Sequence, residues 1–203
     1  VDEAHHLESA TTNALSFRLT QGDLERLLRE LGGSSSGVLG RLLSVTRGAL
    51  RPADYGQFSQ HVQRATDLAF RLQNQSQEFF RFVETFVVTQ REGHPPSVYA
   101  YQERILPATR TQPGWDEVEI GWSAAGETLR LLSKLLGDLY QAAAKLYADG
   151  LGEAEDVAGS LSNLYRRMIE AEVNLSGLIH EPSNDLVCWV EMRPNNGRLS
   201  LNA

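Results

Sequence analysis

Apolar residues recur along most of this chain at the spacing typical of helices that pack against one another. Across residues 58–86 they follow alternating steps of four and three, and the same rhythm returns across residues 118–146 and 157–178. This repeat places a single apolar stripe, here called a seam, along one face of a helix. The pattern predicts three long helices whose seams pack together. The seam positions are Phe58, Val62, Ala65, Ala69, Leu72, Ser76, Phe79, Val83 and Phe86; Val118, Trp122, Ala125, Leu129, Leu132, Leu136, Leu139, Ala143 and Leu146; and Val157, Leu161, Leu164, Met168, Ala171, Leu175 and Leu178.

Turn signals set the expected ends of these long helices. The first runs from about residue 53 to residue 90, on the order of 55 Å at 1.5 Å per residue. Gly93-His94-Pro95-Pro96 ends it, and the loop 107–114 precedes the second helix. The glycines of residues 149–152 separate the second helix from the third, which Pro182 closes.

Shorter helices are expected before the first seam. Residues 5–15 are compatible with one short helix, and Thr20-Gln21-Gly22-Asp23 starts another that ends at Gly32-Gly33. A serine-rich joint follows, and a further helix is expected over about residues 38–50. Because the connections are short, the economical arrangement is an antiparallel bundle with crossing angles near 20°, which the shorter helices cap or complete.

The last part of the chain has the pattern of strands. Residues 186–192 form a β-type run that is apolar on both faces, Pro194-Asn195-Asn196-Gly197 is a turn signal, and residues 198–202 alternate. Residues 97–106 are compatible with either a short strand or an extended crossing. We expect a C-terminal β-hairpin whose partner strands are missing from this chain. The predicted fold class is all-α: an antiparallel bundle of long helices with a small β-hairpin at the C-terminal end.

Composition and charge narrow the classes of function. The chain has 26 acidic and 19 basic residues, a formal net charge of −7, which argues against a dedicated clamp for a phosphate backbone. Seventeen of the bases are Arg, with only Lys134 and Lys145 besides. Arginine suits bidentate or stacked contacts with phosphate, but it is equally typical of surface ion pairs.

Cys188 is the only cysteine, which excludes an internal disulfide and a four-cysteine metal or iron–sulfur site built from this chain alone. One cysteine fits a reducing, cytoplasmic location. No stretch approaches the roughly 20 apolar residues of a membrane span, so no membrane partner is expected.

The candidate chemistry lies in the first residues, Val1-Asp2-Glu3-Ala4-His5-His6-Leu7-Glu8. Asp-Glu-Ala-His matches the acidic motif of helicase-type ATPases, in which the first acid holds Mg²⁺ and the second orients or deprotonates the attacking water. Asp2 and Glu3 match these roles in order, and His5 matches a histidine that can link the nucleotide site to the nucleic-acid site. The abrupt start suggests the cut edge of a motor domain.

Simpler interpretations of the same residues remain open. An Asp-Glu pair at the start of a helix stabilises its N-terminus through the helix dipole. His5 and His6 are also compatible with exposed polar residues, or with a fortuitous metal site that includes Asp2 and Glu3.

Residues 1–8 resemble the second helicase motif of the DinG-type, XPD-like superfamily 2 DNA helicases. In that family a long helical insertion, the arch, follows this motif, and the chain returns through a strand similar to residues 186–192. The resemblance implies three parts: residues 1–15 as the end of motor domain 1 with the Asp-Glu-Ala-His motif, residues 16–183 as the arch-like insertion, and residues 184–203 as the hairpin that returns to motor domain 1.

The resemblance further implies a bacterial parent protein that is an ATP-dependent DNA helicase, 5′ to 3′ in polarity, with a role in DNA repair or replication. Asp2 resembles the Mg²⁺-linked acid that would bind Mg-ATP in the parent, Glu3 the water-activating acid and His5 the coupling histidine. The family's phosphate-binding loop lies upstream of this motif, so this fragment alone is expected to bind no cofactor and to be inactive. Neither an iron–sulfur cluster nor an exonuclease domain of the parent can be inferred from these residues.

The arch borders the path of single-stranded DNA in that family and can also hold protein partners. Aromatic stacking beside a basic side chain is the usual way to bind a single strand, although arginine on a helix is commonly a solvated face and tyrosine commonly caps a core. The candidate DNA contacts are Arg64, Arg71, Arg81, Tyr99, Tyr101, Arg104, Arg166 and Arg167.

Two rival functions are compatible with the sequence. In the first, the chain is a non-enzymatic helical module for protein–protein interaction and the acidic motif is a coincidence. In the second, Asp2, Glu3, His5 and His6 form a small metallohydrolase site, which is disfavoured because ligands bunched at one end of a chain lack supporting contacts.

Overall fold

The computed structural model describes residues 17–91, 101–180, 187–193 and 199–203, and most of these residues are helical. The predicted all-α class with a small C-terminal hairpin is confirmed in part: the chain is mostly helical, but its β part is a four-stranded antiparallel sheet. No described helix combines the length and the apolar composition that crossing a membrane would require. The α-helices among the described residues are α2 (Gln21–Leu31), α3 (Gly37–Arg47), α4 (Pro52–Gln90), α5 (Trp115–Ala148) and α6 (Ala154–Ile179).

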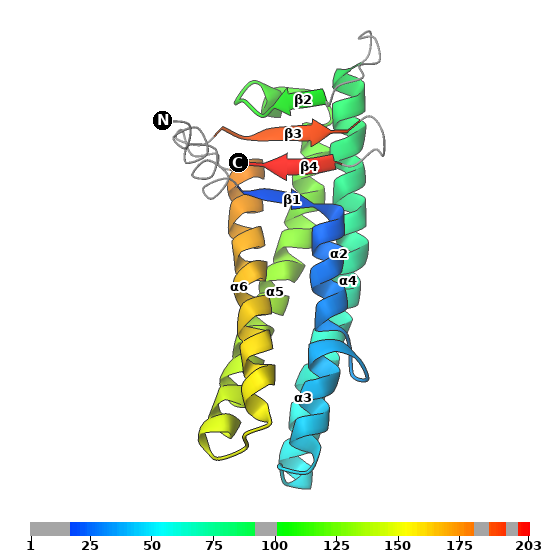
Figure 1. The fold of residues 1–203 in the computed structure, drawn as a ribbon. Coiled ribbons are helices and arrows are strands. Elements are labelled where there is room, and N and C mark those ends of the chain that lie inside the picture. Colours follow the sequence, from blue (N-terminus) through cyan, green and yellow to red (C-terminus); the bar gives the residue numbers. More distant parts are fainter. Residues whose placement is uncertain (1–16, 92–100, 181–186, 194–198) are drawn as a thin grey trace, which may run out of the picture.

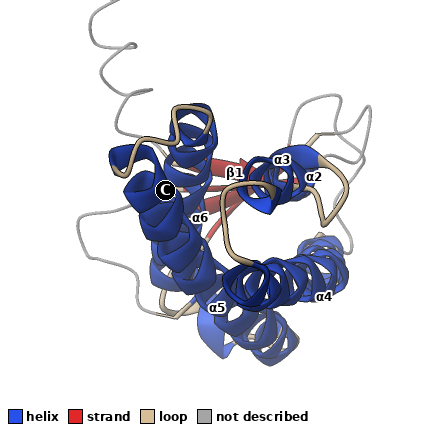
Figure 2. Ribbon diagram, turned by 90° about the horizontal axis from the view of Figure 1, so that it is seen from below, coloured by secondary structure: helices blue, strands red, loops and turns tan. Residues whose placement is uncertain are grey.

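The three long helices lie side by side, and each runs opposite to the one before it (Figure 1). Helix α5 packs along both α4 and α6. Helices α2 and α3 follow each other almost end to end and contact α4 and α6 on the side away from α5 (Figure 2). We call this assembly of α2 to α6 the shaft. The sequence expectation that the two earlier helices complete the packing therefore agrees with these contacts.

The seam residues form the centre of the shaft. They are buried except for Phe58 and Leu146, which are half-buried near the far end of the shaft. Ser76, the polar position of the first seam, is 1% exposed. Its hydroxyl donates to the backbone oxygen of Gln73 at 2.9 Å, so burial leaves its donor satisfied. The steps of four and three thus identified the buried faces of α4, α5 and α6.

A glycine allows α4 and α5 to approach closely. A Cβ atom at Gly121 would lie 2.7 Å from the ring of Phe82. One turn away the rings of Phe79 and Trp122 meet with their centroids 5.3 Å apart. The indole nitrogen of Trp122 also donates to the hydroxyl of Ser176 at 3.1 Å, which joins α5 to α6.

Helix α2 has well-defined ends. Thr20 and Asp23 form a capping box, in which the Asp23 N–H donates to the Thr20 hydroxyl and the Thr20 N–H donates to the Asp23 carboxylate. At the other end Gly32 has φ 72°, and a Cβ there would lie 2.3 Å from the backbone oxygen of Ser36. Only glycine fits this bend, which turns the chain from α2 into α3.

A four-stranded antiparallel sheet lies at one end of the shaft. Its order is β1-β4-β3-β2, so two segments from earlier in the chain flank the predicted hairpin. The expectation that the partner strands are missing from this chain is wrong. The strands are β1 (Arg18–Thr20), β2 (Tyr101–Arg104), β3 (Trp189–Met192) and β4 (Leu199–Asn202).

The two faces of the sheet have different environments. Leu19, Leu201 and Val190 are register partners, are all buried, and pack with the core of the shaft. Because side chains alternate along a strand, their neighbours form the opposite face, here called the outer face. The sequence predicted a strand that is apolar on both faces. One of these faces packs against the shaft, and the other carries Trp189.

Other boundaries differ slightly from the expected ones. Helix α3 ends at Arg47 rather than near residue 50, and the strand alternative for residues 97–106 holds at Tyr101–Arg104. The expected loop 107–114 contains a short 3₁₀ helix, Thr109–Thr111. The helix expected over residues 5–15 lies outside the described residues.

Candidate functional site

The three residues assigned to ATP chemistry, Asp2, Glu3 and His5, lie outside the described residues, as does Tyr99. Their roles therefore stay predictions. Within the described ranges, no three His, Cys, Asp or Glu side chains gather as a metal-binding group.

The arginines predicted on α4 are exposed but do not share one face. Arg64 and Arg71 are one heptad apart and lie on the same stripe, whereas Arg81 is turned by about 80° from Arg71 at 100° per residue. Arg81 pairs with Glu78 at 3.4 Å and lies over the ring of Phe82, 5.5 Å from its centroid. A partnered arginine on a helix surface is typical of a solvated face, which weakens the case for Arg81 as a DNA contact.

The arginines predicted on α6 differ in their surroundings. Arg166 is exposed, whereas Arg167 is half-buried and pairs with Glu30 of α2 at 3.0 Å. This ion pair bridges two helices that the sequence separates by more than 130 residues. Arg167 therefore has a clear role in holding α2 on α6.

Of the two predicted contacts on β2, Tyr101 has partners in the fold and Arg104 is exposed. Tyr101 packs at the edge of the core, its hydroxyl donates to Glu103, and the guanidinium of Arg91 lies 4.7 Å from the centre of its ring. Burial, followed by the hydrogen bond to Glu103, raises the pKa of Tyr101 to about 12. One face of this ring is thus already occupied by a cation. Arg104 is exposed on the outer face of the sheet.

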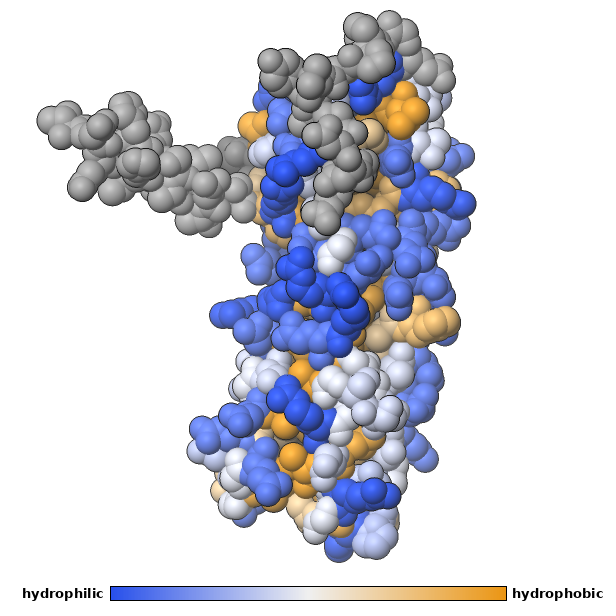
Figure 3. Space-filling model, turned by 45° about the vertical axis from the view of Figure 1, so that its right-hand side comes forward, coloured by the Kyte–Doolittle hydropathy of each residue, from blue (hydrophilic) through white to orange (hydrophobic). Residues whose placement is uncertain are grey.

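The structure does not bring these predicted contacts together. They lie on α4, on α6 and on β2, and α5 lies between the two helices (Figures 1 and 2). On the side of the shaft shown in Figure 3, hydrophobic surface appears in small separate areas among hydrophilic residues. The candidate DNA contacts that the structure describes therefore do not form a single arginine-rich face.

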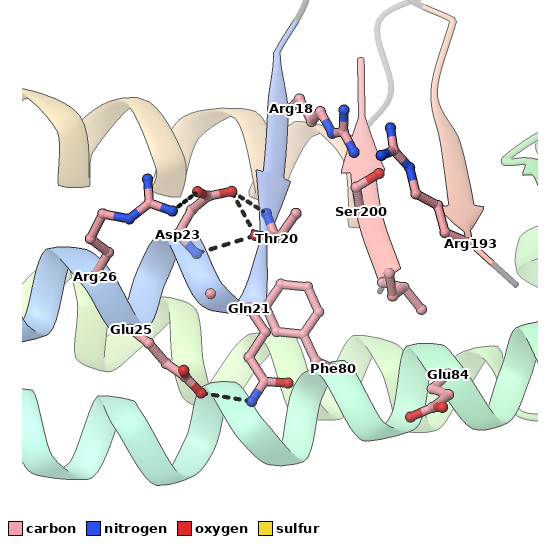
Figure 4. Close-up of a pocket in the computed structure, with 12 residues that line it drawn as sticks. Arg18, Thr20, Gln21, Asp23, Glu25, Arg26, Phe80, Glu84, Arg193 and Ser200 are labelled. Atoms are coloured by element: carbon pink, nitrogen blue, oxygen red, sulfur yellow. Dashed lines mark hydrogen bonds and ion pairs between the residues drawn. The ribbon is translucent and has the colours of Figure 1, made fainter. Parts of the chain in front are cut away.

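A hollow of about 460 Å³ lies where the sheet meets the start of α2 and the side of α4. Figure 4 shows Arg18 and Arg193 extending from separate strands over Ser200, with Asp23 turned toward Thr20 at the start of α2. The charges on the walls balance, since three arginines face three acids. The charged residues lining the hollow are Arg18, Arg26 and Arg193, with Asp23, Glu25 and Glu84.

Glu191 organises the arginines beside this hollow. It accepts from Arg193 at 3.0 Å and from Gln102 at 3.2 Å, and Arg18 approaches it at 4.0 Å across the intervening strand. The hydrogen bond from Arg193 is the main cause that lowers the pKa of Glu191 below its ordinary value. Glu191 thus pairs with Arg18 and Arg193, and Asp23 pairs with Arg26. Because all three arginines of the hollow already face an acid, the arrangement suits a structural network better than an anion site.

Arg110 links the segment before α5 to the end of α6. Its guanidinium donates to the backbone oxygens of Leu178 at 2.6 Å and His180 at 2.8 Å. A cation at this position satisfies carbonyl groups that a helix C-terminus leaves open. Burial disfavours the charged form of each group. It therefore lowers the pKa of Arg110 and raises the pKa of Cys188.

Comparison with known proteins gives no relative for this arrangement. No family model matches the chain, and no curated protein or solved structure matches it.

The sequence did not indicate the network on Glu191 or the role of Arg110. Both depend on pairing between strands and helices that are far apart in the chain. The capping pair Thr20 and Asp23 was the one detectable signal near the hollow, because its spacing is local.

Proposed function

We propose that this chain is the arch-like helical insertion of a DinG-type, ATP-dependent DNA helicase, together with the Asp-Glu-Ala-His motif that precedes it. The observation that carries the proposal is the combination of that motif with a module whose first and last strands are paired. The motif points to the class of motor, and the paired strands fit a module spliced into another domain.

The pairing of β1 with β4 supports the insertion. Phe17 and Ala203 exchange two backbone hydrogen bonds, at 2.7 and 3.0 Å, beside the register pair of Arg18 and Asn202. An insertion leaves its host undisturbed when its entry and exit points are close in space. These points are as close as adjacent strands allow.

In the proposed parent, Asp2 holds Mg²⁺ and thereby Mg-ATP, Glu3 activates the attacking water, and His5 couples the nucleotide site to DNA. The 203-residue chain alone is proposed to have no ATPase, because the phosphate-binding loop belongs to the upstream part of the motor. Its location would be the cytoplasm of a bacterium, where such a motor would act in DNA repair or replication.

The shaft would act as a stiff wall along the path of single-stranded DNA. Interlocked seams, a glycine contact between α4 and α5, and the Trp122–Ser176 hydrogen bond all favour a rigid body. Of the predicted DNA contacts on the helices, Arg64, Arg71 and Arg166 are exposed and remain the better candidates. The net charge of −7 argues that the chain alone binds DNA weakly.

The decisive experiment is Glu3→Gln in the parent protein. Loss of the general base should leave ATP binding intact and reduce turnover by roughly 10²–10⁴-fold. The measurement is steady-state ATP hydrolysis with and without single-stranded DNA, alongside binding of a fluorescent ATP analogue. Glu8→Gln, an acid of the same segment, is the matched control and should keep full activity.

Turnover retained by Glu3→Gln would reject the assignment of Glu3. A parent gene without a Gly-Lys-Ser/Thr loop upstream and a Ser-Ala-Thr motif downstream would reject the helicase as a whole. The non-enzymatic interaction module would then be the better account of the helical shaft.

A further inference from the structure

The outer face of the sheet carries exposed apolar residues that lie next to one another. Among the described residues, the exposed large apolar side chains of the shaft, such as Phe70, Ile120 and Val173, are scattered over α4, α5 and α6. Leu106 and Val187 differ from them, because Leu106 lies just after β2 and Val187 just before the neighbouring strand β3. Their side chains are 45% and 51% exposed.

The strand register places these two residues beside Trp189. Arg104 pairs with Trp189, and the N–H of Ile105 donates to the backbone oxygen of Cys188 at 2.9 Å. The next pair along the ladder is therefore Leu106 with Val187. Alternation puts Leu106 and Val187 on the same outer face as Trp189, while Ile105 and Cys188 are buried on the other. Leu106, Val187 and Trp189 form what we call the outer strip.

Positive charge flanks the outer strip. Arg104 is exposed next to Trp189, and Arg18 lies at the far end of the same row, where Glu191 is its acidic neighbour. A complementary surface would present apolar side chains toward Leu106 and Val187 and an acidic group toward Arg104. Aliphatic residues at the centre with charge at the rim are typical of contacts between protein domains.

The position of the strip indicates which surface meets it. The row of Arg18, Asn202, Trp189 and Arg104 is next to Phe17 and Ala203, which exchange backbone hydrogen bonds where β1 begins and β4 ends. Figure 1 shows the start of β1 beside the end of β4. A domain joined covalently at both of these points is held directly against this edge of the sheet.

We propose that the outer strip docks the module onto the motor domain from which it emerges, through apolar contacts to Leu106, Val187 and Trp189 and an acidic partner for Arg104. The inference rests on the proposed function, because it requires a host domain. Two covalent connections alone would leave a hinge at β1 and β4. A docked strip fixes the angle of the shaft, so the shaft moves with the motor domain as one body.

The test compares the same substitutions in the parent protein and in the 203-residue chain. Leu106→Glu with Val187→Glu places carboxylates on the strip, and Ile120→Glu with Val173→Glu places them on positions of α5 and α6 that are more exposed, at 67% and 58%. The strip variant should lower the thermal unfolding midpoint of the parent by about 4 °C or more. It should leave the midpoint of the 203-residue chain within about 1 °C, and the control variant should be silent in both proteins.

An unchanged midpoint in the parent would overturn the proposal, and so would an equal loss in both proteins, because the effect would then belong to the sheet itself. A loss of oligo-dT binding by Trp189→Ala, with an unchanged midpoint for the strip variant, would also overturn it and assign the strip to single-stranded DNA. The proposed function fails separately, through turnover retained by Glu3→Gln. A loss of stability specific to the parent would still place the strip against a neighbouring domain.

Discussion

The shaft and the sheet are built by different means. The shaft buries long continuous seams, so each of its helices is specified by residues three and four positions apart. The sheet is made of strands of three or four residues, drawn from four segments and joined by backbone pairing and by a network on Glu191. The shaft thus depends on apolar volume along its whole length. The sheet shares that core only through its inner face, and its outer face adds polar contacts between distant segments.

This difference has a functional consequence within the proposal. Rigid packing suits the shaft to be a wall, and in the proposed parent the sheet would join that wall to the motor domain. Exposed apolar residues gather on the outer face of the sheet and are scattered on the described part of the shaft. We therefore expect substitutions in the shaft to change stability and substitutions on the sheet to change how the module is attached.

The largest expected effect tests the shaft. Leu132→Ala removes a fully buried seam side chain of α5 and should lower the free energy of unfolding by about 2–5 kcal/mol, because a cavity remains in a close-packed core. Leu131→Ala, at the adjacent position with 41% exposure, should cost well under about 1.5 kcal/mol. Urea unfolding followed by circular dichroism measures both. Similar losses at the two positions would show that the seam does not define the core.

The sequence predicted the shaft well because its signals are local. The seams located α4, α5 and α6, the Thr20–Asp23 spacing located the start of α2, and Gly32 located its end. Each of these signals lies within a few residues of the feature that it specifies, so no knowledge of distant partners was needed.

The sequence did not predict the assembly of the sheet for the opposite reason. Arg18-Leu19-Thr20 is too short to show an alternating pattern, and its partner Asn202-Leu201-Ser200 lies more than 180 residues away. Arg110 gave no signal because its acceptors are backbone oxygens at the end of another helix. The assignment of Asp2, Glu3 and His5 rests on a motif of four adjacent positions and stays a prediction, while the candidate DNA contacts were chosen by residue type, and the described ones lie on three elements.

An intermediate effect tests the link between the two regions. Arg110→Ala removes two charge-assisted hydrogen bonds from the end of α6 and should lower the free energy of unfolding by about 1–3 kcal/mol. Arg110→Lys should recover part of this loss, because an ammonium group does not span both carbonyls as the guanidinium fork does.

Arg130→Ala, at an exposed position of α5, is the control and should be nearly neutral. Hydrogen exchange at the last turn of α6 gives a local readout beside the unfolding curve. Unchanged protection there in Arg110→Ala would contradict the role of Arg110 as the cap of α6.

The smallest expected effect tests the network on the sheet through pH. The pKa of Glu191 is held below its ordinary value, so its contribution to stability is present above the pKa that it has when unfolded and is lost as pH falls through the folded value. Glu191→Gln should lower the free energy of unfolding at pH 6 by less than about 1 kcal/mol, and this difference from the wild type should shrink at pH 3. Urea unfolding at the two pH values measures it, with Glu127→Gln, an exposed acid of α5, as the control. A difference that stays constant between pH 6 and pH 3 would show that the charge of Glu191 does not hold the strands together, and the sheet would then depend, like the shaft, on its buried apolar face.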